Sequence, residues 1–114
     1  MKYKFYTKTV SNAVYFLIET ENNNTLENFG DSEWTPQKAQ SIIEKVEINR
    51  SLEKTKDPYV WGNEDITVFA NKLGVLLVDK LAMRARQEVQ PLSLPHEEFI
   101  TFMEDFKKFI EDNN

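Results

Sequence analysis

The chain has 114 residues, of which 40% are apolar and 29% charged, and its formal net charge is −5. This length suits one domain with one core, and the composition is that of a folded protein rather than a disordered one. Cysteine is absent, which excludes disulfides, thiol catalysis and thiolate metal sites. We therefore interpret residues 1–114 as a single domain.

Two features of the sequence predict a protein of the cytoplasm that does not enter membranes. The first eight residues alternate lysine with aromatic residues, whereas a signal peptide needs an unbroken apolar run after its basic start. The longest apolar stretches, residues 13–18 and 75–78, fall far short of the roughly 20 residues that span a bilayer. The absence of cysteine also suits a reducing compartment.

The first 20 residues predict a β-hairpin. Tyr3 and Phe5 alternate with lysines, which is the period-two pattern of a half-buried strand. After a polar break at 11–12, residues 14–18 form a second run rich in strand-forming residues. Because this run is apolar on both faces, we expect the second strand to be central and covered on both sides.

Residues 22–24 are three consecutive asparagines, which indicate a turn because asparagine tolerates left-handed backbone angles. Residues 26–29 then predict a third short strand that ends at Gly30. A helix follows over residues 36–49, since Thr35 is a good N-cap and Pro36 suits the first helical position. Its core-facing stripe consists of Ala39, Ile42, Ile43 and Val46. Residues 50–57 are charged and without a pattern, which indicates a surface connection.

A second hairpin is predicted from residues 59–61 and 66–70, with turn residues between them. A further turn leads into residues 75–78, an apolar run typical of a central strand. Residues 80–88 leave two interpretations open: a short helix capped by Asp79, or a continuation of the strand. We favour the helix.

The last predicted element is a helix that begins after an extended piece between Pro91 and Pro95. Its apolar stripe at helical spacing consists of Phe99, Phe102, Met103, Phe106, Phe109 and Ile110. Two amphipathic helices and about five strands joined by short turns predict an α+β fold, in which the helices pack on an antiparallel sheet.

Charge is distributed unevenly along the chain. Between Thr9 and Gln37 there is no Lys or Arg, yet this segment carries five carboxylates: Glu19, Glu21, Glu27, Asp31 and Glu33. If these residues share one surface, their field attracts cationic partners and repels nucleic acid. The alternative is a set of solvated loops around a hairpin.

An aromatic residue among carboxylates is typical of a surface that binds a basic protein. The aromatic supplies contact area, and the charges speed association and fix the orientation of the partner. Trp34 lies beside Glu33 and close to Asp31. We expect the loop residues of the acidic segment to contact a partner ahead of its strand residues, with Glu64 and Asp65 as a further acidic pair. The expected contact residues are thus Glu27, Asp31, Glu33, Trp34, Glu64 and Asp65.

The sequence contains no motif of catalysis, metal binding or phosphate binding. His96 is the only histidine, and at the start of a helix it is more typical of a solvated residue than of a catalytic base. The three glycines lie far apart, so no phosphate-binding loop is present. Neighbouring acidic residues diverge on strands and helices, so no local pair of carboxylates converges on one atom. We expect a protein that is not an enzyme and needs no cofactor.

The order of several blocks resembles bacterial immunity proteins against toxins of contact-dependent growth inhibition. These blocks are residues 33–36 at the start of a helix, residues 59–65, residues 68–71 and the closing helix over 99–110. Residues 59–61, 68–71 and 92–94 are also similar to a small uncharacterised enterobacterial family (YacL-like). The first resemblance implies a protein that binds one cognate toxin domain, often a nuclease, and blocks its active site.

The leading functional hypothesis is therefore a non-enzymatic immunity protein that covers the active site of a basic toxin. An acidic inhibitor can occupy the substrate cleft of a nuclease as a phosphate mimic, with electrostatically steered association. The alternative is a small acidic adaptor or regulatory subunit that uses a sheet edge or a helix exterior to bind another protein.

Overall fold

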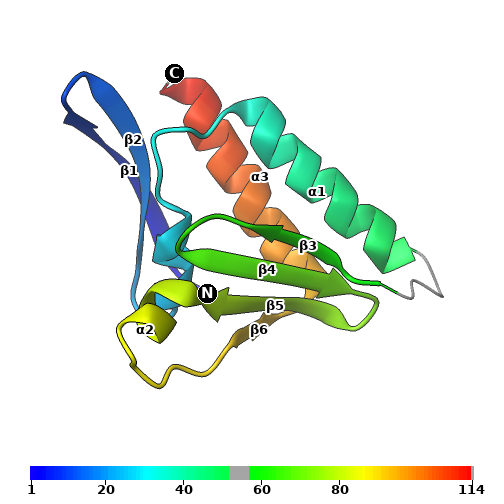
Figure 1. Ribbon diagram of the computed structural model, residues 1–114. Coiled ribbons are helices and arrows are strands. Elements are labelled where there is room, and N and C mark those ends of the chain that lie inside the picture. The colour runs from blue at the N-terminus through cyan, green and yellow to red at the C-terminus, as the bar shows by residue number, and fades with distance from the viewer. Residues whose placement is uncertain (52–56, 114) are drawn as a thin grey trace.

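The structure, a computed structural model, describes residues 1–51 and 57–113. It contains two antiparallel sheets and two long helices, which confirms the α+β class. The strands are β1 (Tyr3–Val10), β2 (Ala13–Thr20), β3 (Tyr59–Gly62), β4 (Ile66–Asn71), β5 (Gly74–Asp79) and β6 (Leu92–Leu94). The helices are the 3-10 helix η1 (Asn24–Phe29) and the α-helices α1 (Pro36–Ser51), α2 (Lys80–Arg84) and α3 (His96–Asp112). Figure 1 shows α1 and α3 side by side behind the sheet of β3 to β6.

The predicted first hairpin is present, but it is separate from the larger sheet. β1 and β2 pair in register from Tyr3 opposite Thr20 to Val10 opposite Ala13, around a turn in which Ser11 and Asn12 have positive φ. The two strands form a sheet of their own, whereas β3, β4, β5 and β6 form the second sheet in that order. The prediction that the second strand is central is therefore wrong. Phe16 of β2 packs against Phe109 of α3, and the backbone of Phe16 forms an isolated bridge with Asp31.

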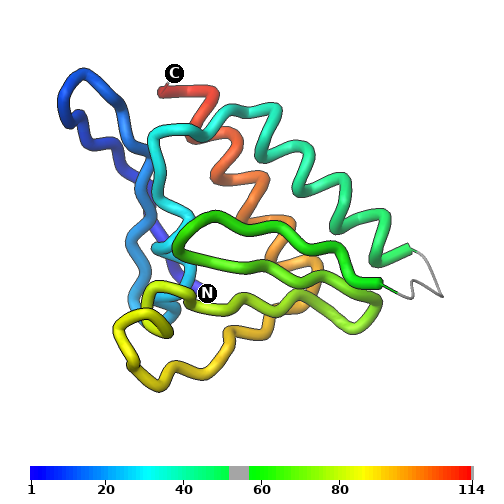
Figure 2. Tube along the Cα trace, in the orientation of Figure 1, coloured from blue at the N-terminus to red at the C-terminus, as the bar shows by residue number. Residues whose placement is uncertain are grey.

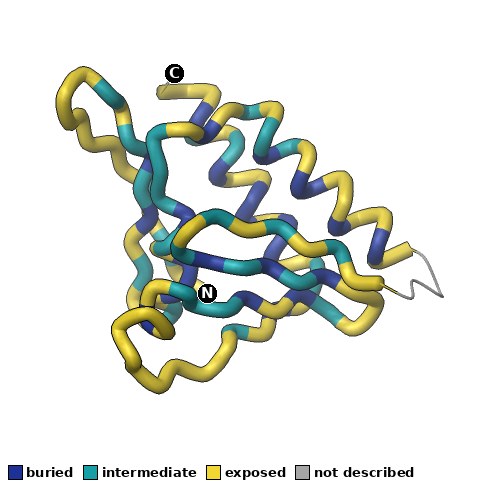
Figure 3. Tube along the Cα trace, viewed as in Figure 1, coloured by how far each residue is buried: buried dark blue, intermediate teal, exposed yellow. Residues whose placement is uncertain are grey.

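The core lies between the larger sheet, the hairpin and the two long helices. α3 lies at its centre and buries one apolar face, as its uninterrupted apolar stripe predicted. Phe5 of β1 stacks on Phe106 with ring centroids 5.3 Å apart. The tip of the hairpin extends away from this core, which is visible in the chain trace (Figure 2) and in the exposed colouring of the tip (Figure 3).

The helix α1 starts where its capping residues predicted. The Thr35 hydroxyl oxygen accepts a hydrogen bond from the Lys38 amide at 3.1 Å, and the predicted stripe of α1 is buried. At its other end Arg50 pairs with Glu97 at the start of α3 at 2.8 Å, which fits an antiparallel arrangement of the two helices. The predicted connection over 50–57 begins inside α1, because residues 50 and 51 are helical; its residues 52–56 lie outside the described residues.

Two further predictions have clear outcomes. Residues 26–29 form part of η1 and not a strand, so that prediction is wrong. Leu26 and Phe29 are completely buried, and their spacing of three places them on one face of a 3-10 helix, whereas on a strand they would point to opposite faces. The helix expected within 80–88 is present as α2, although it ends at Arg84.

Candidate protein interface

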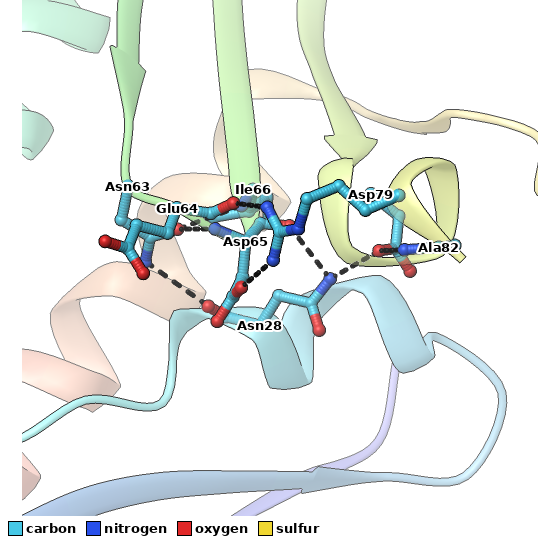
Figure 4. A network of polar contacts seen from close by, with 8 residues as sticks. Asn28, Asn63, Glu64, Asp65, Ile66, Asp79 and Ala82 are labelled. Carbon is cyan, nitrogen blue, oxygen red and sulfur yellow. Dashed lines mark hydrogen bonds and ion pairs between the residues drawn. The ribbon is translucent and has the colours of Figure 1, made fainter. Parts of the chain in front are cut away.

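Three segments that are distant in the sequence meet around Asn28 of η1. The Asn28 side-chain amide donates to the Asp65 carbonyl at 3.2 Å and to the Asp79 carboxylate at 2.8 Å. The Asn63 amide donates in turn to the Asn28 carbonyl at 3.3 Å (Figure 4). One asparagine thus fastens η1 to the β3–β4 turn and to the start of α2.

The two segments that Asn28 contacts are shaped by their own side chains. Asn63 Oδ1 accepts hydrogen bonds from the amides of Asp65 at 2.8 Å and Ile66 at 2.9 Å, which closes the β3–β4 turn. Asp79 Oδ1 accepts from the Ala82 amide at 2.8 Å and so caps α2, as the sequence predicted. Asn28 therefore joins two turns that already have a defined shape.

Arg84 closes the network on its solvent side. Its guanidinium pairs with the Asp65 carboxylate at 2.7 Å and also donates to the Glu64 carbonyl. The two side chains of the ion pair are 53% and 40% exposed, so the pair contributes at most about 1 kcal/mol to stability. Its effect is mainly to orient the β3–β4 turn against α2.

The acidic side chains near the Asn28 network differ in whether hydrogen bonds hold them. Glu64 is exposed, and its carboxylate points away from the network in Figure 4. Glu27 accepts hydrogen bonds from the amide and the hydroxyl of Thr20 at 3.0 and 3.1 Å, which ties η1 to the end of β2. The Glu27 carboxylate thus faces the end of β2, where it lines a surface hollow with Lys4 and Glu19, whereas Glu64 lies on the β3–β4 turn that Asn28 contacts.

The loop after η1 carries the next two carboxylates. Asp31 is partly buried, its backbone bridges Phe16, and its Oδ1 accepts from the Ser32 amide at 2.6 Å. Glu33 is exposed. This loop is held beside β3 because Trp34, which follows it, packs against Trp61 with ring centroids 5.4 Å apart. We call Glu27, Asp31, Glu33, Glu64 and Asp65 the acidic shoulder.

Trp34 itself cannot belong to a contact surface, and that prediction is wrong. It is 3% exposed and packs against Phe29, Trp61 and Phe106. Its indole Nε1 donates to the Phe29 carbonyl at 2.5 Å. The prediction was wrong because neighbouring carboxylates in the sequence do not determine whether a tryptophan side chain points to solvent or into the core.

The five carboxylates of the segment between Thr9 and Gln37 do not form one uniform acidic surface. β1 brings Lys4 directly opposite Glu19 in the hairpin register. Glu19 and Glu21 line a surface hollow together with Lys2 and Lys4. Strand pairing therefore places lysines next to the strand carboxylates, while the loop carboxylates Glu27, Asp31 and Glu33 lie on η1 and after it.

Residues 1–51 and 57–113 contain no group of three or more His, Asp or Glu side chains placed to hold a metal ion. His96 Nε2 lies 2.5 Å from the Asn71 carbonyl oxygen, so the imidazole donates to the β4–β5 turn and fastens the start of α3. In this part of the chain, no helix is both long enough and apolar enough to cross a membrane.

No protein-family model, curated protein or solved structure matches this chain.

The sequence did not single out Asn28, although it determines how the acidic residues are grouped. Its only signal was its place among polar residues before Gly30, which is common in any loop. Two outward-facing apolar residues of the larger sheet, Phe69 and Leu76, were not singled out either. Their signal was the lack of alternation in residues 66–70 and 75–78.

Proposed function

We propose that this chain is a non-enzymatic immunity protein that binds a basic toxin domain, a nuclease, through the acidic shoulder and covers its active site. The observation that supports this proposal most directly is the Asn28 network. It joins η1, which carries Glu27, to the β3–β4 turn, which carries Glu64 and Asp65, although these acidic residues are more than 35 positions apart in the chain.

Rigid presentation matters for such an inhibitor. Backbone segments that are already fixed lose little conformational entropy on binding, so more of the interaction energy appears as affinity. Exposed carboxylates such as Glu33 and Glu64 can occupy phosphate positions in a nuclease cleft, and their field accelerates encounter. The partner is expected in the cytoplasm, where the incoming toxin acts.

The test starts with the gene next to the one that encodes this chain. We expect that neighbour to encode a large secreted protein whose C-terminal domain is toxic when it is produced alone in the cytoplasm. Co-production of this chain should restore growth, and the purified proteins should bind one-to-one in calorimetry. Absence of both rescue and binding with the neighbouring toxin domain would contradict the proposal.

The role of the acidic shoulder is tested by charge reversal. The double variant Glu33→Lys, Glu64→Lys should associate at least about tenfold more slowly at low salt and with a weaker salt dependence, because exposed charges are screened over about 10 Å at 0.1 M salt. A matched control is Glu44→Lys, Asp112→Lys, which changes the net charge equally on α1 and α3. If both double variants slow association to the same degree, only the overall charge acts and the shoulder is not the contact surface.

A further inference from the structure

The first strand of the hairpin, β1, has a neighbouring strand on one side only. Its sheet consists of β1 and β2, which pair along their whole length. Six of the eight residues of β1 are exposed, and the tip of the hairpin extends away from the core in Figure 2. Among residues 1–51 and 57–113, no backbone hydrogen bond joins β1 to any segment other than β2. We call the outer side of β1 the open edge.

The bridge between Phe16 and Asp31 shows which backbone groups of β1 lie on the open edge. The Phe16 amide donates to the Asp31 carbonyl at 2.9 Å, and the Asp31 amide donates to the Phe16 carbonyl at 3.2 Å. The backbone groups of Phe16 thus point away from β1, so Thr7, which lies opposite Phe16, is in a pair of the hairpin that forms no hydrogen bonds. Because such pairs alternate with hydrogen-bonded pairs, the amides and carbonyls of Phe5, Thr7 and Thr9 point out of the open edge.

The side chains of β1 give this edge a positive charge on one face. Phe5 stacks on Phe106 of α3 with ring centroids 5.3 Å apart. Since neighbouring side chains of a strand alternate in direction, Lys4, Tyr6 and Lys8 point away from α3. β1 carries no carboxylate, and none of the ion pairs among the described residues involves these two lysines. The open edge therefore combines unpaired backbone groups with unpaired cations.

The two lysines differ in their surroundings. Lys4 lines a surface hollow together with Glu19 and Glu27, which compensate part of its charge. Lys8 lies further along β1, and residues 5–18 contain no carboxylate. An anionic group at the open edge should therefore interact more strongly with Lys8 than with Lys4.

We propose that the open edge binds an extended acidic segment of another protein, which adds a third strand to the hairpin. The alternating donors and acceptors of an edge strand match the backbone of another extended chain. Partner residues opposite Lys4 and Lys8 carry carboxylates, because opposite charges in directly facing positions stabilise strand pairing. The partner residue between them is apolar, since it faces Tyr6, which is 46% exposed. The bound segment thus has the pattern Glu-x-Φ-x-Glu in either chain direction, where Φ is an apolar residue.

Charge disfavours a second copy of β1 as the added strand. In the antiparallel register centred on Tyr6, Lys4 of each copy would lie opposite Lys8 of the other. The open edge is also separated from the acidic shoulder, because β2 lies between it and Asp31. This proposal therefore does not depend on the proposed function.

Titration of the isotope-labelled full chain with two synthetic heptapeptides tests the proposal by NMR spectroscopy. Thr-Glu-Thr-Val-Thr-Glu-Thr should bind at least about fivefold more tightly than Thr-Lys-Thr-Val-Thr-Lys-Thr at low salt, because two facing pairs change from opposite to like charge. The glutamate peptide should slow amide hydrogen exchange most at Phe5, Thr7 and Thr9. Exchange at Tyr6 and Lys8 should change less, since their amides already bond to β2.

Two variants change the open edge without removing a hydrogen bond of the hairpin. Thr7→Pro removes an outward amide, so it should weaken binding of the glutamate peptide at least about fivefold. Val14→Pro is the matched control, because Val14 lies opposite Thr9 and its amide points out of the other edge of the hairpin. Lys8→Glu should remove the preference for the glutamate peptide. Lys72→Glu makes the same charge change on the β4–β5 turn and should preserve the preference.

Three results overturn the proposal. The first is a glutamate peptide that does not slow exchange at Thr7. The second is equal binding of the two peptides, or a preference that Lys8→Glu leaves intact. The third is slow exchange at Thr7 that develops without peptide as the protein concentration rises, because a second copy then occupies the open edge. None of these measurements involves the toxin domain, so their outcome is independent of the proposed function.

Discussion

Replacing Asn28 with Asp tests whether one side chain holds the acidic shoulder together. The change keeps the shape of the side chain but removes the amide that donates to the Asp65 carbonyl and the Asp79 carboxylate. Two hydrogen bonds of about 1 kcal/mol each are lost. A carboxylate at position 28 also lies about 3 Å from that of Asp79, where repulsion is about 1.4 kcal/mol at the dielectric constant of water and larger in a partly buried site.

Taking about 2 kcal/mol for this repulsion, we expect Asn28→Asp to lower the free energy of unfolding by about 4 kcal/mol. Asn28→Ala removes the same hydrogen bonds without adding a charge, so it should cost about 2 kcal/mol. Urea unfolding at pH 7 measures both variants. The comparison of Asp with Ala isolates the repulsion, because the lost hydrogen bonds are common to both.

The same comparison in an Asp79→Asn background provides the control. With the second carboxylate removed, the difference between Asp and Ala at position 28 should largely disappear. If Asn28→Asp is as stable as Asn28→Ala in the original chain, to within about 0.5 kcal/mol, the close contact of Asn28 with Asp79 does not exist in solution. Asn28 would then not organise the acidic shoulder.

Three other predictions concern the fold. Phe106→Ala should cost about 3–5 kcal/mol in urea unfolding, because Phe106 is completely buried against Phe5; a loss below about 1 kcal/mol would contradict its place in the core. Burial and the hydrogen bond to Asp105 raise the pKa of Tyr3 above its usual 10.0, so stability should be fully present below pH 10 and fall as pH rises further. In Tyr3→Phe the free energy of unfolding should change less between pH 9 and 11 than in the original chain. If the two pH profiles of unfolding are the same, the link between Tyr3 and stability is refuted. Gly74→Ala should destabilise by more than about 1 kcal/mol, since Gly74 has a φ of 153° and an added Cβ would lie 3.0 Å from the Leu94 carbonyl oxygen; a neutral effect would contradict this turn.

The long helices and the hairpins were determined by local signals in the sequence. The Thr35–Pro36 pair and the stripe of α1, the stripe of α3 and the cap at Asp79 act within a few residues, so their structures follow from neighbouring side chains. The turns between β1 and β2 and between β4 and β5 are also determined by local signals in the sequence. Such patterns are strong because capping and helical spacing need no partner elsewhere in the chain.

Local patterns gave wrong predictions where the packing partners of an apolar residue lie elsewhere in the chain. The apolar run of β2 predicted a central strand, yet β2 lies in a two-stranded sheet and packs on α3. Residues 26–29 predicted a strand but form η1, because Leu26 and Phe29 both face the core, which a spacing of three allows on a 3-10 helix. Trp34 was predicted to contact a partner, but it packs against Phe29 and Trp61 inside the core.

The sequence by itself determined the net charge, the absence of thiols, the α+β class and the segments that carry acidic loops. Only the tertiary structure decided which carboxylates lie together, because the pairing of β1 with β2 places Lys4 opposite Glu19 while Asn28 joins η1 to the turn of Glu64. It also decided that α1 and α3 pack on the same face of the larger sheet. Both outcomes depend on contacts between residues far apart in the chain, and the strength of such contacts depends on geometry that no local pattern contains.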